Sequence, residues 1–136
     1  MVEERRRRYI EPKIVDLYKT IFKDFSSYEF LNFWKIGKII NVNDGELIIH
    51  DGDYSNSIRL ILDGEVKIVK EGKSLTYLSR GHFIGEISYI SKEPAIANVI
   101  ANGPVSFMEW NNKKLNNIIE SNNNFWIKIQ NIILHD

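Results

Sequence analysis

The chain has 136 residues, in which 18 Lys and Arg balance 18 Asp and Glu, and it contains no cysteine. This length predicts one domain that buries its own core, and the zero net charge argues against a DNA partner. Without cysteine the chain forms neither a disulfide framework nor a thiolate zinc site. No apolar run approaches the ~20 residues that cross a bilayer, so we expect a soluble, cytoplasmic chain.

A basic run, Arg5, Arg6, Arg7 and Arg8, is the strongest local charge feature. Short basic runs are usually solvated surface, and this is the favoured interpretation. The alternative is proximity to a membrane surface, where each basic residue near an anionic leaflet adds about 1 kcal/mol.

Residues 1–37 are predicted to form a helical segment with two helices. Ser26 and Glu29 have the spacing of a capping box, which opens the second helix, and Gly37 is its expected stop. The first helix is expected to begin near Pro12. Apolar residues at helical spacing along it are Ile14, Leu17, Tyr18, Ile21, Phe22 and Phe25.

Residues 38–110 are predicted to form a β-roll, because all eight glycines lie between Gly37 and Gly103 and turn signals recur every seven to twelve residues or so. Short runs rich in β-branched and aromatic residues separate these turns. The expected strands are Ile39–Val42, Leu47–His50, Ile58–Leu62, Val66–Val69, Leu75–Leu78, Asn98–Ala101 and Val105–Trp110. The fold class that follows is mainly β, a jelly-roll sandwich with two N-terminal and one or two C-terminal helices.

Residues 111–136 are predicted to be helical, with Asn111 as a cap and a break near Asn122. Only 26 residues follow Trp110, so no helix-turn-helix module is expected in the chain as given. An apolar stripe near the end packs on the β-roll in the favoured interpretation. In the alternative it forms a lid or a homodimer contact. The stripe consists of Phe125, Trp126, Ile129, Ile132 and Ile133.

Two segments carry a resemblance to a known family. Leu60–Ile68 is similar to a hairpin with a glycine turn, and the loop 81–98 contains Gly85-Glu86 followed by Pro94-Ala95. Together with the helix, β-roll, helix order, they resemble the cyclic nucleotide-binding domain superfamily of the catabolite-activator and kinase regulatory-subunit type. The layout is also similar to Popeye-like domains and to membrane-tethered bacterial relatives.

The resemblance implies a ligand, cAMP or cGMP, bound at a cassette-like loop. In the family the glutamate of Gly-Glu holds the ribose 2'-hydroxyl and an arginine holds the cyclic phosphate. Here Glu86 matches the glutamate, whereas Ala95 stands at the arginine position. Gly85 would let the backbone approach the ligand, and the N–H groups of Ile87 and Ser88 would face the phosphate. A plain capping role for Glu86 is the equal alternative.

The missing arginine predicts weak or absent binding. Losing one partner of a buried charge pair costs about 2–5 kcal/mol, or roughly 30-fold to several thousand-fold in affinity. Asn98, Lys92 and Arg80 are candidate substitutes, although an ordinary surface or turn role is favoured for each. Ile96 is apolar, which predicts that the loop packs on the core.

Catalysis is not predicted. The three histidines have no metal-ligand spacing, and the chain lacks the usual nucleophile and phosphate-loop motifs, so no metal or cofactor is expected. The leading hypothesis is a non-catalytic regulatory or sensor module with a degenerate phosphate site. Two alternatives stay open, a ligand-free scaffold domain and a small enzyme of the cupin type.

Overall fold

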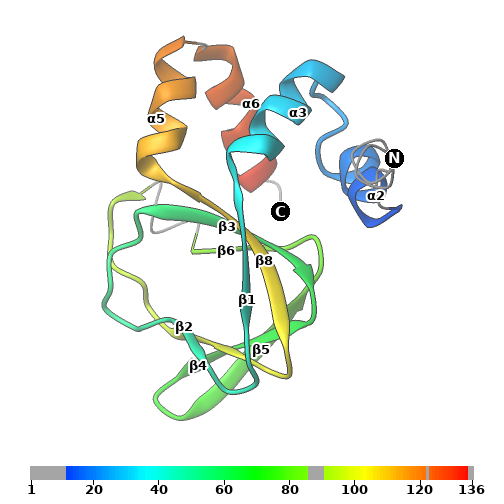
Figure 1. The fold of residues 1–136 in the computed structure, drawn as a ribbon. Helices are drawn as coiled ribbons and strands as arrows, with labels where there is room; N and C mark the ends of the chain where they lie inside the picture. Colours follow the sequence, from blue (N-terminus) through cyan, green and yellow to red (C-terminus); the bar gives the residue numbers. More distant parts are fainter. Residues whose placement is uncertain (1–11, 86–90, 122, 135–136) are drawn as a thin grey trace.

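Two four-stranded antiparallel sheets form a sandwich, and helices from both ends of the chain cover one of them (Figure 1). The computed structural model describes residues 12–85, 91–121 and 123–134. The first sheet has the strand order β1-β8-β3-β6 and the second has the order β2-β7-β4-β5. The predicted fold class, a mainly β sandwich with flanking helices, is confirmed.

The bounds of the elements follow the turn signals of the sequence closely. The helices are α2 (Pro12–Thr20), α3 (Ser27–Ile36), α5 (Asn112–Ser121) and α6 (Asn123–Leu134). The strands are β1 (Lys38–Val42), β2 (Leu47–Ile49), β3 (Ser57–Asp63), β4 (Glu65–Lys70), β5 (Lys73–Ser79), β6 (Phe83–Ile84), β7 (Asn98–Ala101) and β8 (Val105–Asn111). All seven expected strands are present, and β6 is an eighth that the sequence did not predict.

The start of α3 is a capping box, as predicted. The backbone N–H of Glu29 donates to the Ser26 hydroxyl over 3.1 Å, and the Ser26 N–H donates to the Glu29 carboxylate over 2.9 Å. Gly37 ends the helix, but in an extended conformation with φ −76° and ψ 164°. A Cβ there would lie 2.8 Å from both Met108 Cγ and Trp110 Nε1. Gly37 is therefore needed for close packing against β8, not for a left-handed turn.

The first helix is shorter than its apolar spacing predicts. It ends at Thr20, and the chain then turns through residues 21–25. This turn buries Phe22 and Phe25 between the helices, where the two rings pack at 5.4 Å. The Tyr18 hydroxyl closes the turn by donating to the Phe25 carbonyl over 3.0 Å. Burial of aromatic area outweighs continuation of the helix here.

Two apolar clusters hold the domain together. The first lies between the helices and the outer face of the β1-β8-β3-β6 sheet, and it includes Phe33 and Trp110. Their rings stack at 4.1 Å, and the Trp110 Nε1–H donates to the Phe33 carbonyl over 2.7 Å. The second cluster lies between the two sheets and consists of Ile49, Ile61, Val66, Ile84, Val99, Ala101, Val105 and Phe107.

The C-terminal stripe packs on its own domain, which is the favoured interpretation of the sequence. Phe125, Ile129 and Ile133 are buried in the first cluster, and Trp126 and Ile132 pack half-buried against it. Asn111 caps α5, since its side chain accepts the Lys114 N–H over 3.0 Å. Within the described residues no helix is both long and apolar enough to span a membrane.

Candidate functional site

The candidate site is a pocket of about 520 Å3 between the two sheets, closed on one side by the end of the cassette-like loop. Strand β6 ends at Gly85, which has a φ of 76° that residues with a side chain rarely adopt. The chain is described again from Ser91 and enters β7 at Asn98. The lining residues are Ile49, Ile68, Leu78, Phe83, Ile84, Gly85, Ser91, Glu93, Pro94, Ala95, Ile96, Ala97 and Val99.

A larger hollow, of about 650 Å3, lies at the junction of α2 and α6. The larger hollow is lined by residues of the helical layer, including Lys23, Asp24 and Lys128. It contains none of the residues that the sequence predicts to bind ligand. Its size alone therefore does not make it the functional site.

The structure brings two of the predicted site residues to the same pocket. Gly85 and Ala95 both line it. Asn98 does not, and its side-chain oxygen accepts the Asp51 N–H over 2.7 Å. Glu86, Ile87 and Ser88 lie outside the described residues.

Ala95 is fixed by backbone hydrogen bonds and apolar packing. Its N–H donates to the Asp53 carbonyl and its own carbonyl accepts the Gly52 N–H, each over 2.8 Å. The methyl group packs against the cluster between the sheets. Ile96 differs from its prediction: it is 75% exposed, whereas Ala97 beside it is buried and Ala95 is half-buried, at the bend that leads into β7.

The two basic residues suggested as substitutes for the missing arginine do not line the pocket. Arg80 forms an ion pair with Asp16 of α2, with 3.5 Å between Nη2 and Oδ2. Lys92 is exposed and has a φ of 64°. A different lysine reaches the loop from β4, since Lys70 Nζ donates to the Ile96 carbonyl over 2.8 Å.

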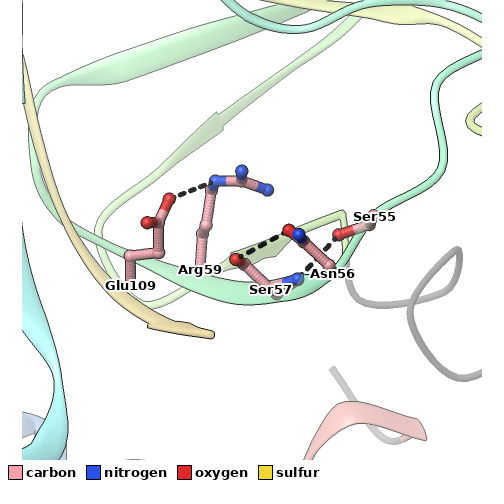
Figure 2. Close-up of polar contacts among 5 residues, drawn as sticks. All are labelled: Ser55, Asn56, Ser57, Arg59 and Glu109. Carbon is pink, nitrogen blue, oxygen red and sulfur yellow. Dashed lines mark hydrogen bonds and ion pairs between the residues drawn. The ribbon is translucent and has the colours of Figure 1, made fainter. Parts of the chain in front are cut away.

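A charged pair that the sequence motifs do not reveal lies inside the sandwich. Arg59 on β3 lies opposite Glu109 on β8, and its Nε–H donates to Glu109 Oε2 over 3.0 Å (Figure 2). The side chains are 16% and 28% exposed. The sequence does contain a signal for it, because Arg59 is a charged residue within the apolar run Ile58–Leu62. Which face of the sheet its side chain lies on depends on the strand register, which the sequence alone does not show.

Further polar side chains form hydrogen bonds at the start of β3. The Ser57 N–H donates to the Ser55 hydroxyl, and the Ser57 hydroxyl donates to the Asn56 side-chain oxygen, each over 3.3 Å (Figure 2). The Ser55 hydroxyl in turn donates to the Ser57 carbonyl over 2.7 Å. These bonds fix the turn that leads into the strand. Among the described residues no cluster of three or more His, Cys, Asp or Glu side chains offers a metal site.

Comparison with known proteins places the chain in a family. The family model described as the cyclic nucleotide-binding domain matches residues 39–122, more than half of the chain. The chain is 33% identical over 82 residues to a cGMP-dependent protein kinase of Toxoplasma gondii, covering 60% of this chain and 8% of that kinase. It is 26% identical over 103 residues to a cAMP-dependent protein kinase regulatory subunit of Mucor circinelloides, covering 73% of this chain and 24% of that subunit. The chain thus spans only a small part of both proteins.

Solved structures show the same fold. A cyclic nucleotide-binding domain from Methylobacillus flagellatus has a TM-score of 0.81 at 24% identity, covering 90% of this chain and 73% of that one. The regulatory subunit of a cAMP-independent protein kinase A from Trypanosoma brucei has a TM-score of 0.66 at 21% identity, covering 73% of this chain and 38% of that one. Because the family model matches the β-roll and the loop that lines the pocket, the chain belongs to the cyclic nucleotide-binding domain family.

Proposed function

We propose that this chain is a non-catalytic regulatory module whose phosphate site is degenerate, so that it binds cAMP or cGMP weakly or not at all. The observation that carries the proposal is the alanine at position 95, in the place where the family resemblance implies an arginine. Ala95 lines the pocket and contributes only a methyl group to it.

The physical argument concerns the cyclic phosphate. A guanidinium group binds such an anion with charge and two aligned N–H donors, and a methyl group supplies neither. The lining of the pocket is mainly isoleucine, valine, leucine and alanine. Moving an anion from water into such surroundings is costly unless donors replace its hydration. The expected loss of about 2–5 kcal/mol lowers the affinity roughly 30-fold to several thousand-fold.

The remaining ligand contacts of the proposal come from the family resemblance. Glu86 would accept hydrogen bonds from the ribose, the Ile87 and Ser88 amides would face the phosphate, and Gly85 would leave room for both. These contacts fix orientation without supplying a cation. The Trypanosoma brucei regulatory subunit, described as belonging to a cAMP-independent kinase, supports the idea that this fold also operates without cAMP.

Calorimetric titration of the purified chain with cAMP and with cGMP tests the proposal. We expect dissociation constants of about 100 μM or weaker, or no heat of binding at millimolar ligand. Submicromolar binding of either nucleotide would contradict the affinity argument. Nucleotide that stays bound through purification would contradict it as well.

A scaffold function is the second candidate. It is favoured by the outer face of the edge strand β5, where Leu75 and Tyr77 are 60% and 51% exposed. The two partners proposed here are a second copy of the chain, which would form a homodimer, and a membrane surface, which would be contacted through Arg5–Arg8. Sedimentation velocity, and co-sedimentation with vesicles made with and without phosphatidylserine, test them. If the chain sediments as a monomer and binds neither type of vesicle, the scaffold function is excluded.

A further inference from the structure

Arg59 places a positive charge inside the sandwich, next to the proposed ligand pocket. It lies opposite Glu109 in β8 and opposite Ile84 in β6, and directly paired residues of neighbouring strands share a face. Ile84 belongs to the cluster between the two sheets. Arg59 and Glu109 therefore point between the sheets, away from the helices.

The ion pair uses only part of the guanidinium group. Its Nε–H donates to Glu109, and neither Nη group has a hydrogen-bond partner among the described residues. The side chain is 16% exposed, although arginine is rarely buried without being fully paired. Two donor groups are thus available to a ligand.

One of these donors, Nη1, lies beside Gly85, although Arg59 is not itself among the residues that line the pocket. A Cβ at residue 85 would lie 2.8 Å from Ile49 Cδ1, 3.4 Å from Arg59 Nη1 and 3.6 Å from the Ser55 hydroxyl. Gly85 and Ile49 both line the pocket. The guanidinium group consequently lies against the pocket wall at its Gly85 end, and no side chain of residue 85 separates the two.

We infer that Arg59 is the residue that contacts an anionic ligand in this pocket, here a cyclic phosphodiester, and that Glu109 weakens this contact by neutralising the guanidinium group. The inference rests on the proposed function, which makes the pocket a degenerate nucleotide site. It adds a physical reason for weak binding: a cation is available, but it already has a carboxylate partner.

The test measures cAMP affinity by calorimetry in Glu109→Gln, which keeps the size and the hydrogen-bonding oxygen of the side chain. Removing the carboxylate charge is expected to raise the affinity for cAMP at least about fivefold over the wild type. The double variant Arg59→Gln, Glu109→Gln, which leaves no unpaired charge behind, is expected to lose that gain. Arg80→Gln is the matched control, because Arg80 pairs with Asp16 outside the pocket, and it should bind as the wild type does.

The outcomes separate this inference from the proposed function. If the Arg59–Glu109 ion pair only supports the fold, the wild type and Glu109→Gln should bind cAMP with equal affinity. That result would overturn the inference. Thermal unfolding of each variant shows whether a loss of binding reflects a loss of structure. Ala95→Arg tests the proposed function independently, because it restores the family arginine. If Ala95→Arg binds cAMP more tightly than the wild type but Glu109→Gln does not, the inference about Arg59 is refuted and the proposed function stands. If Glu109→Gln binds more tightly but Ala95→Arg does not, the degenerate phosphate site is refuted and the inference about Arg59 stands.

Discussion

At the scale of single residues, the glycines of the β-roll differ in how much space their surroundings leave for a side chain. Gly72 lies in the hairpin between β4 and β5 with a φ of 78° and no neighbouring atom within 4 Å of a Cβ. Gly85 has a similar φ of 76°, but a Cβ there would lie 2.8 Å from Ile49 Cδ1. The two positions carry the same backbone strain and differ in crowding.

This difference gives a prediction for alanine substitutions. Gly72→Ala is expected to lower the free energy of unfolding by about 1–2 kcal/mol, the cost of a left-handed residue with a side chain. Gly85→Ala should cost about 1 kcal/mol more, because the Ile49 side chain must also shift. Urea unfolding followed by circular dichroism measures both. Equal losses in the two variants would show that the space beside Gly85 is not enclosed as described.

The residues of the site differ in how far the sequence could reveal them. The spacing of Gly85, Pro94 and Ala95 identifies the loop, because glycine and proline constrain the backbone locally. Arg59 could not be assigned to the pocket in this way. Its direction depends on the pairing of β3 with β6 and β8, which is set by contacts distant in the sequence.

At the scale of elements, an ion pair joins the N-terminal helix α3 to the C-terminal helix α6. Lys128 Nζ of α6 lies 2.7 Å from the Glu29 carboxylate of α3, and it stands 5.9 Å from the centre of the Phe25 ring. The hydrogen bond from Lys128, followed by the bond from the Ser26 backbone, lowers the pKa of Glu29 below its ordinary value of 4.5. The capping box and the C-terminal helix thus share one carboxylate.

The lowered pKa predicts how stability depends on pH. Because the pKa of Glu29 is lower in the folded chain, its contribution is present above about pH 4.5 and is lost as the pH falls through the folded value. Lys128→Met should therefore be less stable than the wild type at pH 7, by up to about 1 kcal/mol. The difference should shrink below about pH 4.5. Lys113→Met, at an exposed position of α5, is the control. A difference that stays constant from pH 7 to pH 3 would contradict this account.

Element types were predictable where local chemistry decides them. The capping box at Ser26, the cap at Asn111 and the seven strands between turn signals were all readable from the sequence. The end of α2 at Thr20 and the two-residue strand β6 were not, because tertiary packing of Phe22 and pairing with β3 produce them. These are the features that depend on contacts between distant segments.

For the whole molecule, α6 completes a core that the β-roll and the first helices cannot close alone. Phe125 packs at 5.5 Å from Phe25 and at 5.3 Å from Phe33, and Ile129 and Ile133 are buried in the same cluster. This arrangement makes the C-terminal helix part of the core of the domain.

Deleting residues 122–136 is therefore expected to abolish cooperative folding. Each of the three buried side chains contributes on the order of 2–4 kcal/mol, and their sum is comparable to the total stability of a domain. Thermal unfolding followed by circular dichroism checks this. A cooperative transition within a few degrees of the wild type would instead indicate a detachable lid.

The central claim is that the missing guanidinium at position 95 sets the affinity for cyclic nucleotide. The most direct measurement is the ratio of cAMP dissociation constants of the wild type and Ala95→Arg, determined by calorimetry under the same conditions. Leu75→Arg adds the same charge on the outer face of β5 and serves as the control. We predict at least a roughly 30-fold gain for Ala95→Arg and none for Leu75→Arg. Tight binding by the wild type, or no gain from the arginine at position 95, would contradict the account.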